Sequence, residues 1–372
     1  MMNKVIGICN LHNEPHLGEL TKNRPLAAVT FLGRYGIIDF TLSNFSNSYI
    51  DKIYVLVKKG IVAIRRHIGS GAIWNRNTKL GHIDLVLNEK GLSNKPFNTD
   101  INNIKEGLDL DLVDFEYAVI APSYMLSSMD YRPIIDAHIA SGAQITAVYQ
   151  HVENADKEFL RCDKYKFDAN GNITSSKKNI GRTPIADISL DTFIINKRLL
   201  KKIINDSGKV SQLYSIQDMI NFYIEEEVVK VNSYKYEGFV VPILSLEGYV
   251  NNSLSLLNYH TRNRLFIEDW PIYTTTHNTP PALYAKDADV QNSFIANGAV
   301  IKGKVTNSII SREVLVEKGA EVNNCIIFTK TVIGRDVKIN RVVSDKGVVI
   351  TNTKKLSGTE DEFIVLSQGA KL

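Results

Sequence analysis

Three copies of one short pattern decide the fold of the carboxyl-terminal part of this chain: Val305-Thr-Asn-Ser-Ile-Ile310, Val322-Asn-Asn-Cys-Ile-Ile327 and Ile339-Asn-Arg-Val-Val343. The copies start 17 residues apart, at positions 305, 322 and 339. Aliphatic residues recur about every six positions, a spacing typical of three short parallel strands per turn. We expect a parallel β-helix of triangular section, with Asn307 and Asn324 at its corners because asparagine tolerates turn conformations. The alternative is a generic β-rich sandwich.

The first two-thirds of the chain alternates strand-like and helix-like segments. Short apolar runs predict strands at Val5–Cys9, Lys52–Val57, Tyr117–Ala121 and Gln144–Val148. Helical apolar spacing predicts helices at Ile37–Ser48, Tyr131–Ser141 and Leu246–Asn258. The turn signal Asp168-Ala-Asn-Gly-Asn172 predicts a hairpin of Tyr165–Asp168 and Ile173–Ser176. This alternation indicates an α/β domain with a Rossmann-like, mostly parallel mixed sheet.

The composition then shifts. Trp270-Pro-Ile-Tyr273 and Pro280-Pro-Ala282 indicate an extended linker. We therefore expect the α/β domain over residues 1–262, the linker over 263–286 and the β-helix over 287–372.

Bulk properties exclude several classes of protein. The formal charge of +4 comes from 44 basic and 40 acidic residues, which argues against a dedicated nucleic-acid binder. The three cysteines have no paired spacing, which favours a reducing compartment. No apolar run approaches the roughly 18 residues that cross a bilayer. We expect a cytoplasmic protein with neither nucleic acid nor membrane as partner.

The loop after the first predicted strand lacks the residues that its position requires. In nucleotide-binding α/β folds, glycines here let backbone N–H groups surround phosphates. This chain has no glycine between Gly7 and Gly18, and Glu14 and Pro15 add a carboxylate and remove a donor.

Several motifs nevertheless resemble the ADP-glucose pyrophosphorylases (glucose-1-phosphate adenylyltransferases). The motifs are Thr21-Lys-Asn-Arg-Pro-Leu-Ala-Ala-Val29, Gly36-Ile-Ile-Asp-Phe-Thr-Leu-Ser-Asn44, Met129-Asp-Tyr131, Trp270-Pro-Ile272 and Pro280-Pro-Ala282. The resemblance implies a nucleotidyltransferase domain followed by a left-handed parallel β-helix. It also implies synthesis of ADP-glucose from ATP and glucose 1-phosphate with Mg²⁺, in a tetramer.

The sequence departs from this family at the groups that perform the chemistry. The family's phosphate loop, Gly-Gly-x-Gly-x-Arg-Leu, falls on Leu11–Leu17, and its phosphate-binding lysine falls on Leu26. Its two Mg²⁺-binding aspartates fall on Tyr124 and Pro242. A phenol is a poor ligand for Mg²⁺, and a proline side chain has no ligand atom. Looser matches place its base- and sugar-binding motifs on Thr99–Asn103, Lys178-Asn179 and Ser189-Leu-Asp191, where only Ser189 is retained.

Two histidines stand in the altered loop, at His12 and His16. His16 takes the place of the family's arginine, and an imidazole with a pKa near 6.5 is mostly neutral at pH 7. Both could be replacement phosphate ligands. We favour surface-loop histidines, because Glu14 lies between them.

Basic residues near the loop survive. In the family such residues contribute to an anionic effector site, so the resemblance implies a sugar-phosphate site at Lys22, Arg24 and Arg34. For Arg24 we favour a solvated surface charge.

The scaffold is retained while the chemical groups are lost, a pattern that resembles the non-catalytic, regulatory GlgD-type subunit found beside a catalytic partner in some bacteria. Our first hypothesis is such a subunit of a glycogen-biosynthesis heterotetramer, with no catalytic residue and no metal ligand of its own. The alternatives are an active adenylyltransferase with substitute carboxylates at Asp100, Asp130 and Asp191, and a stand-alone sugar-phosphate sensor. An acyltransferase acting through the β-helix is disfavoured, because no histidine follows His277.

Overall fold

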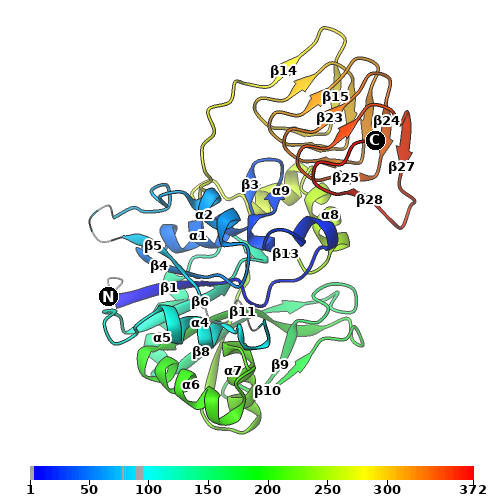
Figure 1. The fold of residues 1–372 in the computed structure, drawn as a ribbon. Helices are drawn as coiled ribbons and strands as arrows, with labels where there is room; N and C mark the ends of the chain where they lie inside the picture. Colours follow the sequence, from blue (N-terminus) through cyan, green and yellow to red (C-terminus); the bar gives the residue numbers. More distant parts are fainter. Residues whose placement is uncertain (1–3, 78, 80, 89–94) are drawn as a thin grey trace. The chain divides into compact units, whose positions relative to one another are not determined.

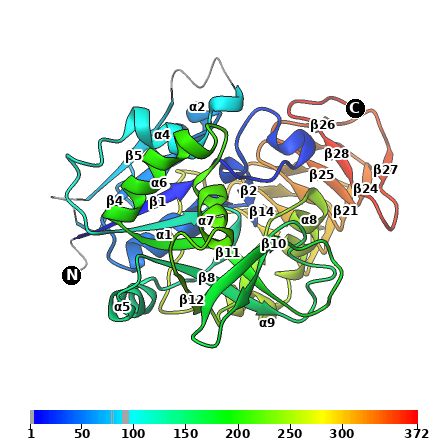
Figure 2. The ribbon, with the colours of Figure 1, turned by 90° about the horizontal axis from the view of Figure 1, so that it is seen from below.

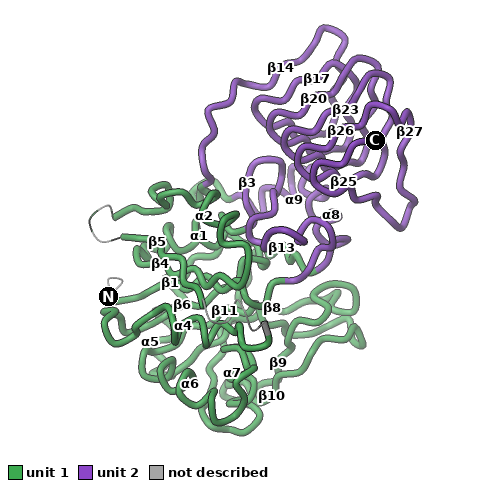
Figure 3. The backbone as a smooth tube through the Cα atoms, in the orientation of Figure 1, with its two compact units in different colours: residues 1–14, 38–244, 267–273 green, residues 15–37, 245–266, 274–372 purple. Residues whose placement is uncertain are grey.

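The chain forms two compact units, each discontinuous in sequence (Figure 3). The computed structural model describes residues 4–77, 79, 81–88 and 95–372. Unit 1 holds residues 1–14, 38–244 and 267–273, and unit 2 holds residues 15–37, 245–266 and 274–372. The boundaries that we expected at residues 262 and 286 divide the chain into consecutive segments, and they stay a prediction. In the described ranges, no helix is both long and apolar enough to cross a membrane.

Unit 1 is built on a mixed sheet with strand order β5-β4-β1-β6-β11-β8-β12-β10-β9 (Figure 1). The strands are β1 (Val5–Asn10), β4 (Lys52–Leu56), β5 (His82–Val86), β6 (Tyr117–Pro122), β8 (Ile145–Val152), β9 (Asp163–Phe167), β10 (Asn172–Lys178), β11 (Ala186–Asn196) and β12 (Val231–Lys235). All of them run in one direction except β10 and β11. The predicted Rossmann-like sheet, its four predicted strands and the β9–β10 hairpin are confirmed.

Helices cover both faces of this sheet (Figures 1 and 2). One layer contains α4 (Asp100–Gly107), α6 (Lys197–Val210) and α7 (Ile216–Glu225), which share a buried core with Ile6, Ile8 and Phe193. The other contains α1 (Ile38–Asn47) and α5 (Arg132–Ser141). A Cβ on Gly7 of β1 would lie 2.9 Å from the Phe45 ring of α1, so glycine is required there. Because successive strand residues face opposite ways, both layers are buried against one sheet.

Shorter elements complete unit 1. They are α2 (Ile61–Ile68), the 3₁₀ turn η4 (Lys95–Phe97), and the antiparallel pair β7 (Met125–Ser127) and β13 (Val240–Pro242).

Unit 2 contains a parallel β-helix made of three five-stranded sheets. The first sheet is β14 (Leu283–Tyr284), β17 (Val300–Ile301), β20 (Leu315–Val316), β23 (Val332–Ile333) and β26 (Val349–Ile350). The second is β15 (Asp289–Gln291), β18 (Lys304–Thr306), β21 (Glu321–Asn323), β24 (Lys338–Asn340) and β27 (Lys355–Ser357). The third is β16 (Phe294–Ile295), β19 (Ile309–Ile310), β22 (Ile326–Ile327), β25 (Val342–Ser344) and β28 (Ile364–Leu366).

The predicted repeat is confirmed at the level of single residues. Val305 pairs with Val322, and Val322 pairs with Ile339, in parallel register. The predicted corner residues Asn307 and Asn324 have φ angles of 48° and 49°, in the left-handed region that asparagine tolerates.

The rest of unit 2 comes from two other parts of the chain. These are η2 (Gly18–Thr21), η3 (Leu26–Ala28), the hairpin of β2 (Thr30–Phe31) and β3 (Tyr35–Gly36), and the helices α8 (Leu246–Ser255) and α9 (Tyr259–Leu265). The ring of Phe31 packs 6.4 Å from that of Tyr249, whose hydroxyl donates to the carbonyl of Thr30 at 2.6 Å. The predicted helix at Leu246–Asn258 is therefore confirmed as α8, and it belongs to unit 2.

Candidate functional sites

Buried polar side chains fasten the loop after β1 to helix α4. The amide Nδ2 of Asn10 donates to Oδ2 of Asp100 at 2.6 Å. The His12 ring is held at both nitrogens: Nε2 lies 2.8 Å from Nδ2 of Asn103, and Nδ1 lies 3.2 Å from the carbonyl of Asn98. Since an amide Nδ2 donates and a carbonyl accepts, the ring is neutral with its proton on Nδ1.

The environment keeps His12 uncharged. Burial lowers the pKa of His12 to about 3, and the nearby Lys58 ammonium acts in the same direction. The interpretation of His12 as a surface-loop histidine is therefore wrong, because long-range amide partners bury it. His16 is exposed, and its Nδ1 accepts the backbone N–H of Gly18 at 3.1 Å.

Hydrogen bonds also close the space beside this loop. The Ser123 hydroxyl donates to Oε1 of Glu14 at 2.6 Å. The Tyr124 hydroxyl donates to Oδ2 of Asp191 at 2.5 Å, while Nε2 of Gln217 donates to the other Asp191 oxygen at 2.6 Å. We call Asn13, Glu14, Ser123, Tyr124, Asp191 and Gln217 the closed site; Asn13 joins it by donating to Gln217 at 3.1 Å.

The closed site carries strongly shifted pKa values. Burial, reinforced by the Asp163 carboxylate, raises the pKa of Asp191 to about 6. Burial and the same Asp191 raise the pKa of Tyr124 well above its usual value, so the phenol stays a donor at neutral pH. Lys178 forms an ion pair with Asp163 at 2.8 Å beside it.

Little space remains in the closed site. The cavity lined by Asn13, Tyr124, Asp191 and Gln217 has a volume of about 20 Å³. A cavity needs roughly 10–15 Å³ to hold one water molecule. This cavity has room for about one water molecule and is far too small to enclose a nucleotide.

The two positions that the resemblance assigns to metal ligands lie side by side. β7 and β13 pair antiparallel, with Pro242 opposite Met125, and the N–H of Ile243 donates to the carbonyl of Tyr124 at 2.8 Å. The fold thus brings together two positions that are 118 residues apart (124 and 242), as one metal site requires, but neither supplies a carboxylate.

The three candidate substitute carboxylates are all engaged in hydrogen bonds or ion pairs within the chain. Asp191 belongs to the closed site, and Asp100 accepts from Asn10 and from the backbone N–H groups of Ile101 and Ile216. Asp130 forms a bidentate ion pair with Arg132. No cluster of His, Cys, Asp and Glu suited to a metal occurs within the described ranges. These residues do not fit Mg²⁺, so we derive no step through it.

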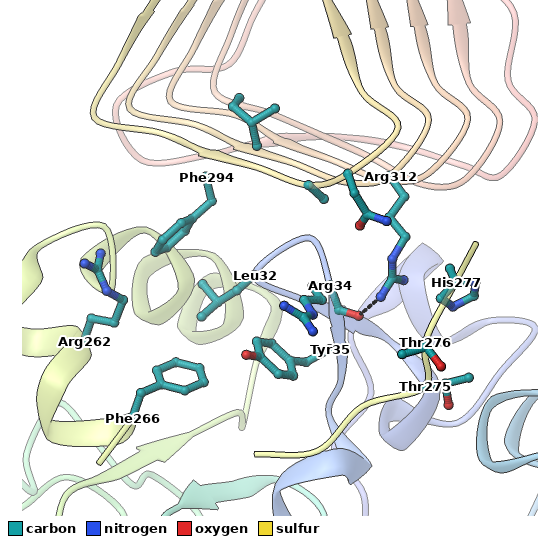
Figure 4. Close-up of a pocket in the computed structure, with 13 residues that line it drawn as sticks. Leu32, Arg34, Tyr35, Arg262, Phe266, Thr275, Thr276, His277, Phe294 and Arg312 are labelled. Carbon is teal, nitrogen blue, oxygen red and sulfur yellow. Dashed lines mark hydrogen bonds between the residues drawn. The ribbon is translucent and has the colours of Figure 1, made fainter. Parts of the chain in front are cut away.

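Unit 2 contains a larger, open site that we call the cationic pocket (Figure 4). Its volume is about 550 Å³, and Arg262 and Arg312 lie on opposite sides of Arg34. The other lining residues are Leu32, Tyr35, Phe266, Thr275, Thr276, His277, Phe294, Ile295, Ala296 and Asn297. No carboxylate is among the described residues that line it.

A tight turn positions Arg34 in the cationic pocket. The N–H of Arg34 donates to the carbonyl of Phe31 at 3.2 Å, and the two central residues, Leu32 and Gly33, have φ angles of 48° and 72°. A side chain at Gly33 would place its Cβ 3.0 Å from the carbonyl oxygen of Ile310. Glycine therefore serves both the left-handed turn and the close approach to the β-helix backbone.

Aromatic rings hold the arginines in place. The guanidinium of Arg262 lies 5.3 Å from the ring centre of Phe294, and that of Arg34 lies 5.8 Å from that of Tyr35. Arg312 donates from NH2 to the carbonyl of Arg34 at 2.8 Å (Figure 4). In the described part of the chain, neither Arg34 nor Arg262 has an ion-pair partner. Guanidinium groups held by stacking keep N–H donors free for phosphate or carboxylate.

The other predicted effector residues lie in different surroundings. Lys22 is exposed and pairs with Glu19 at 3.4 Å. Arg24 is 7% exposed and donates from NH2 to Oδ1 of Asp345 at 2.6 Å. The interpretation of Arg24 as a solvated surface charge is wrong, because its side chain is buried and pairs with the carboxylate of Asp345, 321 residues further along the chain. Leu26 is buried, at 1% exposure.

Sequence reasoning missed Arg262, Arg312 and His277. They come from α9, a β-helix corner and the segment before β14, and none belongs to a recognisable motif. The sequence carries no signal that joins them to Arg34.

Comparison with known proteins first defines the class. Residues 16–159 match the nucleotidyl transferase family, and residues 280–362 match the GlmU-like, C-terminal hexapeptide family. Together with the three parallel sheets, these matches confirm a nucleotidyltransferase-type domain followed by a left-handed parallel β-helix.

Individual relatives narrow the class. Glucose-1-phosphate adenylyltransferase of Bacillus subtilis (strain 168) is 30% identical over 83% of this chain and 81% of its own length. The chain therefore belongs to the glucose-1-phosphate adenylyltransferase family. It is also 28% identical to the glycogen biosynthesis protein GlgD of the same strain, over 99% of this chain and 96% of that protein. The corresponding enzyme of Bacillus anthracis is 27% identical over 95% of both chains.

Proposed function

We propose that this chain is a non-catalytic, regulatory subunit that assembles with a catalytic glucose-1-phosphate adenylyltransferase subunit into a heterotetramer for bacterial glycogen synthesis. The closed site carries the proposal. Its cavity has a volume of about 20 Å³, and the Glu14–Ser123 and Tyr124–Asp191 hydrogen bonds lie in the same site. Loss of one preorganised electrostatic group commonly costs about 10²–10³ in rate. Loss of the loop glycines, the lysine and both metal ligands should remove turnover.

The cationic pocket supports the regulatory part of the proposal. Three arginines line the pocket, and the described lining contains no carboxylate, which suits an anion; the aromatic walls suit a ligand that also has a ring. We propose that an organic phosphate, such as a sugar phosphate, binds there and alters the affinity of the partner for its substrates. Such coupling typically amounts to about 5–150-fold.

The experiment adds this chain in increasing amounts to a catalytic subunit at fixed concentration. ADP-glucose formation is followed at several substrate concentrations, and sedimentation velocity records the complex. The expected result is a stable complex whose kinetic constants differ from those of the catalytic subunit alone. Unchanged kinetics together with no complex would contradict the proposal.

A stand-alone sensor is the second candidate, and the cationic pocket is the observation that favours it. Calorimetry with glucose 1-phosphate or inorganic phosphate tests the pocket directly. We expect Arg262→Ala or Arg312→Ala to weaken binding about tenfold or more, while Arg198→Ala on α6 serves as the control. Binding without any complex in the sedimentation experiment would favour the sensor over the subunit.

A further inference from the structure

A second pocket, in unit 1, holds groups that the proposed function does not use. It has a volume of about 490 Å³, within the range of small-molecule sites, and lies where α1 ends, beside the segment 267–273. Four charged side chains are among the described residues that line it, and their formal charges cancel: Arg76, Asp130, Arg132 and Asp269. We call it the neutral pocket, in contrast to the cationic pocket, whose described lining has no carboxylate.

Two buried side chains of α1 hold one wall of the neutral pocket. Oδ1 of Asn44 accepts the indole N–H of Trp270 at 2.8 Å, and Nδ2 of Asn47 donates to the carbonyl of Pro271 at 2.9 Å. Asn44 and Asn47 are only 2% and 5% exposed. A wall fixed in this way is already ordered before a ligand arrives, so binding does not have to order it.

The ring of Tyr49, which also lines the neutral pocket, stands at a strained position. Tyr49 follows the end of α1 with a φ angle of 61°, in the left-handed region that a bulky residue rarely adopts. Burial does not compensate for the strain, because Tyr49 is 48% exposed. An exposed aromatic ring that is kept at a strained position indicates contact with a ligand.

The two arginines of the neutral pocket are oriented by aromatic rings. The guanidinium of Arg76 lies 4.8 Å from the ring centre of Tyr49. That of Arg132 lies 5.5 Å from the same ring and 5.8 Å from the ring of Trp270. Stacking of this kind fixes the plane of a guanidinium and leaves its N–H edge available to a ligand.

Hydrogen-bond donors and acceptors alternate in the neutral pocket. Arg132 pairs with Asp130, with Nε–Oδ1 and NH2–Oδ2 distances of 2.9 and 2.7 Å. Arg76 and Asp269 have no ion-pair partner in the described part of the chain. An anion would meet two carboxylates here, whereas a hydroxyl group can donate to a carboxylate and accept from a guanidinium. The charge pattern therefore favours a neutral ligand that carries many hydroxyl groups.

We propose that the neutral pocket binds a stretch of neutral α-1,4-linked glucan. A sugar ring has hydroxyl groups at its edge, which suit Arg76 and Asp269, and C–H groups on its faces, which pack against aromatic rings such as Tyr49. The choice of α-glucan over other neutral sugars rests on the proposed role in glycogen synthesis, whereas the site itself goes beyond that role. Such a site would hold the complex at the polymer whose synthesis it supports.

The test is a titration of the full chain alone with maltohexaose, followed by calorimetry and by tryptophan fluorescence. Trp270 lines the neutral pocket, and the other tryptophan of the chain, Trp74, is 1% exposed, so a change in emission reports on this pocket. We expect saturable binding with a change in emission. Cellohexaose, which differs only in its β-linkage, should bind about tenfold more weakly or not at all.

Tyr49→Gly is the sharpest variant, because glycine removes the ring and relieves the left-handed strain. It should weaken maltohexaose binding about tenfold or more, while the urea midpoint of unfolding stays unchanged or rises. Asp269→Asn should weaken binding about threefold to tenfold, because an amide replaces a charged acceptor. The matched controls are Tyr284→Ala, at a 51% exposed ring on β14, and Glu153→Gln, at an exposed carboxylate outside the pocket.

Three results would overturn the inference. They are no binding of maltohexaose up to millimolar concentration, binding that Tyr49→Gly and Asp269→Asn leave at the level of the controls, or cellohexaose binding as tight as that of maltohexaose. The titration contains no catalytic subunit, nucleotide or sugar phosphate. Its failure is therefore separate from failure of the regulatory proposal, which the absence of a complex would show.

Discussion

The buried ion pair of Arg24 and Asp345 offers a quantitative test of how unit 2 is held together. Their side chains are 8% and 4% exposed, and the NH2–Oδ1 distance is 2.6 Å. The Arg24 guanidinium also lies 5.9 Å from the ring centre of Phe328. Replacing Arg24 with methionine leaves the Asp345 carboxylate buried without a counter-charge. Breaking one side of a buried pair costs about 3–5 kcal/mol, and that is the loss of stability we expect.

A double-variant cycle separates this penalty from simple loss of packing. Asp345 also accepts the backbone N–H of Lys346 at 2.6 Å, and asparagine retains that hydrogen bond without the charge. Arg24→Met/Asp345→Asn should therefore regain at least about 2 kcal/mol relative to Arg24→Met.

Urea unfolding followed by two probes measures the effect. The chain has two tryptophans, Trp74 and Trp270, and both lie in unit 1, so fluorescence reports on that unit. Far-UV circular dichroism includes the β-helix. We expect Arg24→Met to shift the dichroism transition more than the fluorescence transition. A loss below about 1 kcal/mol, or a double variant no more stable than the single one, would refute the reasoning.

Three further predictions concern single positions. The pKa of His12 is lowered from 6.5 to about 3 in the folded chain, so the unfolded chain takes up a proton first as the pH falls. The free energy of unfolding is therefore highest above pH 6.5 and decreases by about 1.4 kcal/mol per pH unit as the pH falls toward 3. In acid titrations, His12→Gln should reduce the slope of the free energy of unfolding against pH by the equivalent of one proton. An unchanged slope would contradict this prediction. Gly7→Ala should destabilise by about 1–3 kcal/mol in urea, because its Cβ would meet the Phe45 ring at 2.9 Å. At the corner residue Asn324, alanine should lower the melting temperature while glycine should preserve it, and equal effects would argue against the corner conformation.

Local pattern explains why much of the fold was predictable. The 17-residue repeat sets which residues stack in the β-helix, so Val305, Val322 and Ile339 fall into register directly from their spacing. The strands of unit 1 follow from short apolar runs, and the hairpin follows from one turn signal. Each of these depends on neighbours in sequence, which periodicity captures.

The surroundings of the site residues depend on contacts with residues far away in the sequence, which a single sequence does not reveal. His12 looked like a loop residue, yet Asn98 and Asn103 bury it. Arg24 looked like a surface charge, yet Asp345 neutralises it. The loss of metal ligands at Tyr124 and Pro242 was visible from motifs, whereas the hydrogen bond that fills the space, from Tyr124 to Asp191, was not.

The most direct test of the central claim is a single-turnover assay of the purified chain alone. The chain, in excess over labelled ATP, is mixed with glucose 1-phosphate and Mg²⁺, and ADP-glucose is quantified over hours. The account predicts no product above the protein-free blank, because the glycines of the phosphate loop are absent and no carboxylate stands at Tyr124 or Pro242. Product formation at a rate comparable to that of a catalytic family member would contradict it.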